Sequence, residues 1–312
     1  MQGLELCRKY FENAALPRLK TDYTSLFPRL AAGLVGNGSE CFGYDDEASR
    51  DHDWGVDFFI WVTEADRDKI PELTLWKREL LENIAPPEYS RARTNHGAEI
   101  AVMTCGDFYK SLIGTSGRPT DLIRWLRTPE DNLAMCVNGE VFLDNAGEFT
   151  AIRNALLDYY PEDVRLKKIA AKCMSIAQTG QYNHLRMAQR GDFVTVHVVL
   201  SKFIEQVTAL VFLLNRTYKP YYKWAQRKLS ELPILGGKIS ALLERLVLVP
   251  GYDDAALQAQ KALIDSICAL LTQELRRQGL SDAEDYFLAR HGESVQTRIK
   301  DPMLRSLPAQ FE

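Results

Sequence analysis

The chain lacks the sequence features of several protein classes. Its six cysteines are far apart and no two form a closely spaced pair, which argues against both a zinc site and a disulfide framework. No run approaches about 18 uninterrupted apolar residues, and the first residues carry charges where a secretory signal would be apolar. We therefore expect buried, reduced thiols in a cytoplasmic protein that has no membrane partner.

The sequence also lacks a strong excess of either charge and a serine-nucleophile motif. With 38 basic and 42 acidic residues the net charge is −4, so any contact with a nucleic acid would need a local basic cluster. Residues 114–117 have the wrong spacing for the Gly-x-Ser-x-Gly elbow of a serine hydrolase. His52-Asp53 precedes a predicted strand and no helical histidine pair follows it, which argues against an HD-type phosphohydrolase.

The hydrophobic pattern changes along the chain. The first half predicts helices at 3–16, 23–34 and 71–84, and strands at 56–63, 98–104 and 140–143. Later residues predict mainly helices, at 121–136, 148–158, 162–189, 192–215, 220–231, 237–248 and 253–279. We expect an α+β protein, with a small mixed β-sheet domain at 1–150 and an all-helical bundle domain at 151–312.

The most apolar helix candidate is 193–214. Polar residues interrupt it, namely His197, Lys202, Glu205 and Gln206. This pattern favours a buried bundle helix over a membrane span.

A glycine-rich turn and an acidic pair stand before the first strong strand. Glycine and serine at Gly38-Ser39 would let backbone N–H groups approach a phosphate closely. Asp51 and Asp53 are two residues apart, so in extended chain both carboxylates point to one side, as ligands for Mg²⁺ with Mn²⁺ as an alternative. The competing interpretation is that these aspartates are solvated turn formers or helix caps.

A two-metal site needs a third carboxylate. Glu99, in the predicted strand at 98–104, is the first choice, because burying an acid there without a cation would be costly. Asp57 is the rival, since it has the same strand parity as Asp51 and Asp53.

Two polar groups in the helical half are candidates for nucleotide contact. Arg186 and Arg190 share a helix face with Asn183 and could bind phosphate, although a solvated face or an Arg–Asp pair explains them equally well. Lys219, Tyr222 and Lys223 lie in an aromatic-rich segment that could stack on a base and meet the triphosphate. The alternative is that its aromatic residues pin the preceding helix to the bundle.

These motifs resemble the nucleotidyltransferase superfamily of DNA polymerase beta type, whose signature is Gly-Ser, about a dozen residues and then Asp-x-Asp entering a strand. A more specific similarity, over about residues 10–235, is to a bacterial family described as a domain of unknown function. It is carried by residues 36–40, 43–47, 49–55 and 215–224. The resemblance implies metal binding by Asp51 and Asp53, triphosphate contact by Gly38 and Ser39, and a helical domain like that of kanamycin nucleotidyltransferases. Trp54-Gly55 departs from the superfamily pattern, in which the second aspartate begins the strand.

We predict that the protein is a Mg²⁺-dependent nucleotidyltransferase, moving a nucleoside monophosphate from a nucleoside triphosphate to a hydroxyl acceptor. The candidates for the acceptor are a small molecule, a tRNA, a protein and a second nucleotide. The alternative function is binding of a nucleotide or RNA without catalysis.

Overall fold

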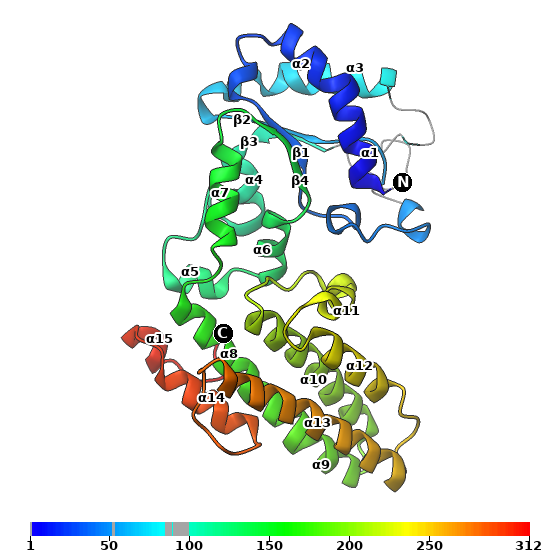
Figure 1. Ribbon diagram of the computed structural model, residues 1–312, viewed down its shortest axis with the longest axis vertical. Coiled ribbons are helices and arrows are strands. Elements are labelled where there is room, and N and C mark those ends of the chain that lie inside the picture. Colours follow the sequence, from blue (N-terminus) through cyan, green and yellow to red (C-terminus); the bar gives the residue numbers. More distant parts are fainter. Residues whose placement is uncertain (1, 52–53, 85–88, 90–99) are drawn as a thin grey trace. The chain divides into compact units, whose positions relative to one another are not determined.

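The structure is a computed structural model that describes residues 2–51, 54–84, 89 and 100–312 (Figure 1). The chain divides into two compact units. The sheet unit comprises Met1–Pro119 and Thr128–Asp158, and the helical unit comprises Thr120–Arg127 and Tyr159–Glu312. A small mixed sheet with helices in one unit and helices alone in the other confirm the α+β class.

The sheet has four strands in the order β3-β2-β1-β4. These are β1 (Ala31–Leu34), β2 (Phe59–Val62), β3 (Val102–Thr104) and β4 (Glu140–Asp144). β1 is antiparallel to β2 and β4, whereas β2 and β3 are parallel. The strands predicted at 56–63 and 140–143 are confirmed, and the described part of 98–104 contains β3.

The helix predicted at 23–34 is wrong. The chain makes a short 3₁₀ turn at Phe27–Arg29 and then enters β1. Pro28 prevents a helix from continuing through this segment, and all four residues of β1 are buried because the strand lies between two others. A strand this short and uniformly apolar has no alternation by which a sequence pattern could identify it.

The first helical segment runs past the predicted end at residue 16. It comprises α1 (Gly3–Tyr10), a π-helical turn (Phe11–Ala15) and α2 (Leu16–Asp22). Pro17 lacks an N–H and crowds the carbonyl one turn earlier, and the wider π turn before it lets the helix continue.

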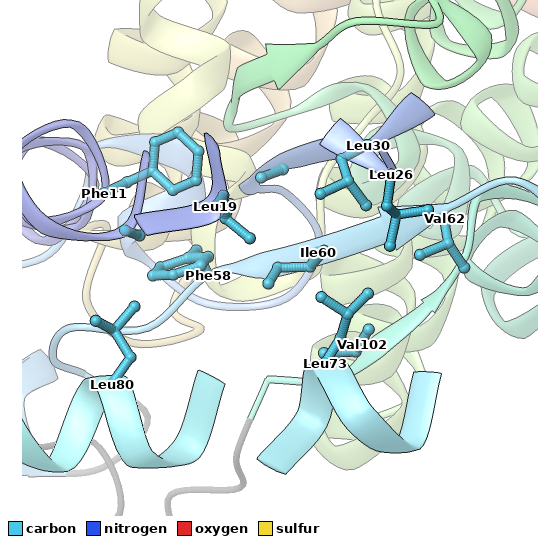
Figure 2. Packing of buried hydrophobic residues seen from close by; sticks show 12 residues of the cluster. Phe11, Leu19, Leu26, Leu30, Phe58, Ile60, Val62, Leu73, Leu80 and Val102 are labelled. Carbon is cyan, nitrogen blue, oxygen red and sulfur yellow. The ribbon is translucent and has the colours of Figure 1, made fainter. Parts of the chain in front are cut away.

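Side chains at alternate positions along β2 and the residue before it point to opposite faces of the sheet. Phe58, Ile60 and Val62 lie in a core with residues of the first helical segment and of α3 (Ile70–Ile84), as Figure 2 shows. Trp61, on the other face, stacks on Phe149 with ring centroids 3.8 Å apart. This second layer consists of α4 (Cys105–Ile113), α6 (Glu130–Val137) and α7 (Glu148–Leu157). Both faces of β2 are therefore buried.

The helical unit matches most of the predicted helices. Its elements are α5 (Leu122–Arg127), α8 (Glu162–Ile176), a π-helical segment (Ala177–Asn183), α9 (His184–Gln189), α10 (Phe193–Leu214), α11 (Tyr222–Glu231), α12 (Gly236–Val247), α13 (Asp254–Arg277), α14 (Leu288–Thr297) and α15 (Pro302–Ser306). Gly180 in the π-helical segment lets α10 approach closely, because a Cβ there would lie 2.3 Å from the Phe203 ring.

Among the described residues, α10 alone is long and apolar enough to cross a membrane by length and composition. In the structure 61% of its most apolar stretch is buried, and Val207, Leu210 and Leu214 are among the core residues. Such burial is typical of the central helix of a bundle.

Candidate functional site

The glycine turn, Val35–Ser39, follows the central strand β1 directly. Gly36 and Gly38 have φ values of +112° and +111°, which side chains other than hydrogen rarely permit. Asn138 holds this turn from the segment before β4: its Oδ1 accepts from the Gly36 N–H at 2.7 Å and its Nδ2 donates to the Gly36 carbonyl at 2.7 Å. The turn is therefore fixed at its base, while Gly38 and Ser39 remain half-exposed.

Three elements meet at one end of the sheet. The antiparallel register Ala31↔Trp61 and Gly33↔Phe59 puts the start of β2 beside the end of β1, where the glycine turn begins. The parallel register Ile60↔Val102 puts the start of β3 at the same end. The chain thus enters β2 and β3 on the side of the sheet from which it leaves β1.

Asp45 closes the loop after the glycine turn. Its Oδ2 accepts from the Gly3 N–H at 2.8 Å, at the start of α1, and from the Trp54 indole N–H at 3.0 Å. The Cys7 thiol donates to the Gly55 carbonyl at 3.3 Å. Trp54 and Gly55 immediately follow Asp53, so α1 fixes the chain at the exit of the acidic segment.

Glu40 is a buried acid beside the glycine turn. A Cβ placed at Gly38 would meet the Glu40 side chain at 3.7 Å, and one at Gly3 would meet its Oε2 at 2.9 Å. Glu40 and Asp45 therefore lie at the N-terminus of α1, where the helix dipole stabilises negative charge. This role of Glu40 and Asp45 was not predicted, since the start of α1 is about 40 residues away from them in the sequence.

The predicted metal ligands are not among the side chains that the structure describes. Asp53 and Glu99 lie outside the described residues, and so does the side chain of Asp51, so all three assignments stay predictions. Within the described ranges, no three histidine, cysteine or acidic side chains are grouped to hold a metal ion.

Asp57 has a structural partner. Its Oδ1 lies 2.6 Å from the Lys77 Nζ and accepts from the Phe58 N–H at 2.7 Å, and its Oδ2 accepts from the Ile100 N–H at 2.8 Å. Burial raises the pKa of the Asp57 carboxyl, and the Lys77 ammonium opposes that shift. Both carboxylate oxygens are thus engaged by protein groups, which weighs against Asp57 as the third metal ligand. The sequence feature that could have indicated this ion pair is Lys77, a charged residue that lies between Leu73 and Leu80 on the buried side of α3.

The two groups of nucleotide-contact candidates lie at opposite ends of α10. Arg190 ends α9, three residues before α10 begins, and Arg186 stacks on Tyr182 at 4.4 Å. Lys219, Tyr222 and Lys223 follow the end of α10, and the latter two begin α11. The 22 residues of α10 span about 33 Å at 1.5 Å per residue. One nucleoside triphosphate is too short to contact both groups.

The aromatic segment at 218–224 has two different environments. Tyr218 is buried against Tyr159 and Tyr160, with ring centroids 4.8 and 5.1 Å apart, so it pins the segment to the bundle. Tyr221 and Tyr222 are 48% and 74% exposed. The structural interpretation thus fits Tyr218, whereas the side chains of the next two tyrosines are exposed.

Comparison with known proteins gives few matches. A family model described as a domain of unknown function (DUF4037) matches residues 125–225. The search of curated proteins found no match. Among solved structures, the chain is similar to a nucleotidyltransferase-like protein from Exiguobacterium sibiricum 255-15, with 12% sequence identity, 91% of this chain and 88% of that chain covered, and a TM-score of 0.35. Likeness at this level carries no argument about function.

Proposed function

We propose that the protein is a Mg²⁺-dependent nucleotidyltransferase. A hydroxyl of the acceptor attacks the α-phosphate of a nucleoside triphosphate, and pyrophosphate leaves. The observation that supports this proposal is the convergence at one end of the sheet: the clamped glycine turn leaves β1 where the chain enters β2 and β3. Asp51 and Asp53 precede β2 and Glu99 precedes β3 in the sequence, so short connections lead from each to that end.

The proposed roles follow from the chemistry of the side chains. Asp51 and Asp53 hold the metal, since paired hard oxygens suit Mg²⁺, and Glu99 assists the incoming hydroxyl. The bound metal supplies charge for the phosphates. The Gly38 backbone and Ser39 hold the β- and γ-phosphates. Most of the rate enhancement then comes from positioning and electrostatic stabilisation.

The helical unit supplies further nucleotide contacts in this proposal. Because of the length of α10, either Arg186 and Arg190 or Lys219, Tyr222 and Lys223 contact the triphosphate, but not both sets. Alanine substitution of each set separately should raise KM for the triphosphate in one case only. An increase of similar size in both would contradict this division.

The acidic pair is tested by replacing Asp53 with asparagine. We expect this variant to lose transfer of label from an α-³²P nucleoside triphosphate to any component of a cell extract, because one metal ligand loses its charge. Asp46→Asn is the matched control: Asp46 is exposed in the same loop and accepts from the Ser49 N–H at 3.0 Å. Unchanged transfer by Asp53→Asn would refute the proposal, and loss in both variants would mean that the loop fold, rather than a metal ligand, was disturbed.

The alternative is nucleotide binding without transfer. The buried acidic side chain of Glu40 beside Gly38 would repel a phosphate, so it weighs against nucleotide binding that needs no metal. Calorimetry with a non-hydrolysable ATP analogue distinguishes the two functions, since the enzyme should bind it only with Mg²⁺ and a metal-independent binder should not need the ion.

A further inference from the structure

A local basic cluster lies in the segment from Arg216 to Lys228. The segment contains five lysine or arginine residues and no aspartate or glutamate, in a chain whose net charge is −4. It also contains four aromatic residues, Tyr218, Tyr221, Tyr222 and Trp224. Cations interleaved with aromatic rings are the combination that single-stranded nucleic acids require.

The two ends of this cluster are already neutralised, but its middle is not. Arg216 pairs with Glu162 at 2.7 Å, and Lys228 pairs with Glu231 at 3.1 Å. Lys219 and Lys223 have no carboxylate partner within the part of the chain that the structure describes, and Lys223 lies over the Trp224 ring at 5.4 Å. Their charge is therefore available to an anionic ligand.

Exposed tyrosines stand between these two lysines. The ring centroids of Tyr221 and Tyr222 are 4.3 Å apart, and the two ring planes are inclined at 47° to each other. In α11, Tyr222 and Lys223 share the exposed side with Arg227, while Ala225 and Leu229 are buried. We call the region formed by Lys219, Tyr221, Tyr222, Lys223 and Arg227 the lysine–tyrosine surface; Lys219 is partly exposed and the other four are exposed.

The base of this surface is rigid. The Asn215 side chain donates to the Val211 and Ile234 carbonyls at 2.7 and 2.9 Å, and its Oδ1 accepts from the Ile234 N–H at 2.9 Å. Tyr218 is buried, as described above, and Pro220 is buried as well. Holding the tyrosines in place before binding lowers the entropy cost of stacking a base on them.

We infer that the lysine–tyrosine surface binds single-stranded nucleic acid. It extends from Lys219 along about one and a half turns of α11 to Arg227, and it offers two rings and several cations, more than one nucleotide would occupy. An anionic membrane fits less well, because the aliphatic residues of α11, Ala225 and Leu229, are buried. The inference deepens the proposed function: if the protein transfers nucleotides, the strand on this surface is the acceptor.

The test is fluorescence anisotropy with labelled oligouridine and oligothymidine of about 12 nucleotides, a length within the usual site size. Tyr222→Ala should weaken binding about 5- to 150-fold, the range measured for one base–aromatic stack. The double variant Lys219→Ala/Lys223→Ala should reduce the slope of log K against log salt by about 1.4, since each lost phosphate contact contributes about 0.7. A preference for one of the two oligonucleotides would identify RNA or DNA as the strand.

Matched controls are Tyr286→Ala and Lys300→Ala, an exposed tyrosine and an exposed lysine elsewhere in the helical unit. Both should bind as the unmodified protein does. Absence of binding, or equal affinity in all variants, would overturn the inference. So would binding to phosphatidylserine vesicles that depends on Lys219 and Lys223 while neither oligonucleotide binds.

The measurement separates this inference from the proposed function. It is made in EDTA without nucleoside triphosphate, so its result does not depend on the acidic pair. If no strand binds but labelled triphosphate modifies another acceptor, the inference is wrong and the proposed function stands. If a strand binds through Tyr222 and labelled triphosphate modifies neither that strand nor any component of a cell extract, the surface is established and the proposed function fails.

Discussion

Replacing Lys77 with methionine should destabilise the sheet unit by about 3–5 kcal/mol, the usual cost of removing one partner of a buried ion pair. Lys77 and Asp57 side chains are 1% and 3% exposed, and their atoms lie 2.6 Å apart. Methionine preserves most of the aliphatic packing, so the loss comes mainly from leaving the Asp57 carboxylate buried without its cation. The two backbone N–H donors, of Phe58 and Ile100, remain and keep the loss from being larger.

The loss should depend on pH. Burial already raises the pKa of Asp57 above its usual value, so its ionisation costs stability as the pH rises from the unfolded pKa through the folded one. Without Lys77 the folded pKa rises further, and each additional unit costs about 1.4 kcal/mol at neutral pH. The difference between the variant and the unmodified protein should therefore shrink as the pH falls toward 4, because a smaller fraction of the Asp57 carboxyl is then ionised in the folded protein.

The assay is urea unfolding followed by tryptophan fluorescence, since three of the five tryptophans, Trp54, Trp61 and Trp76, lie in the sheet unit. The double variant Asp57→Leu/Lys77→Met should recover most of the stability, because an apolar pair has no charge to bury. A loss below about 1 kcal/mol that is the same at pH 4 and pH 7 would refute the assignment of Lys77 and Asp57 as a buried ion pair.

Three further predictions concern the glycine turn, the acidic loop and the thiols. Asn138→Ala removes both hydrogen bonds to Gly36 and should cost about 1–3 kcal/mol, with a raised KM for the triphosphate; an unchanged KM would show that the turn does not contact it. Trp54→Phe removes the indole N–H that donates to the Asp45 carboxylate. We expect kcat to fall while the urea midpoint of unfolding changes little, and both quantities are measured on the same variant. All six cysteines are buried, and burial raises the pKa of the Cys105 and Cys136 thiols to about 12, so a thiol reagent should react with the folded protein only after urea is added.

The sequence predicted the elements whose patterns are long. The amphipathic helix at 71–84 and the apolar helix at 192–215 were found almost to their ends as α3 and α10. β2 was found because aromatic and β-branched residues run together there. β1 was missed, since its position between two strands is set by tertiary pairing rather than by any local pattern.

The candidate site was predicted only in part. The glycine turn could be identified because its two positions with positive φ are occupied by glycine, the residue that tolerates such values best. Its partner Asn138 could not, since it is 102 residues away from Gly36 in the chain. The Asp57–Lys77 pair shows the same limit: an acid near two others suggests a shared metal, and only the packing of α3 reveals the cation that engages it.

The dependence of the glycine turn on Asn138 has a consequence for biosynthesis. The sheet unit is discontinuous in sequence, and its later part, Thr128–Asp158, supplies β4 and the Asn138 side chain. A nascent chain released from the ribosome as far as Pro119 therefore holds β1 with an exposed edge and an unsupported turn, a species prone to misassociation. The end of the sheet that carries the glycine turn can mature only after residues 128–158 have been translated.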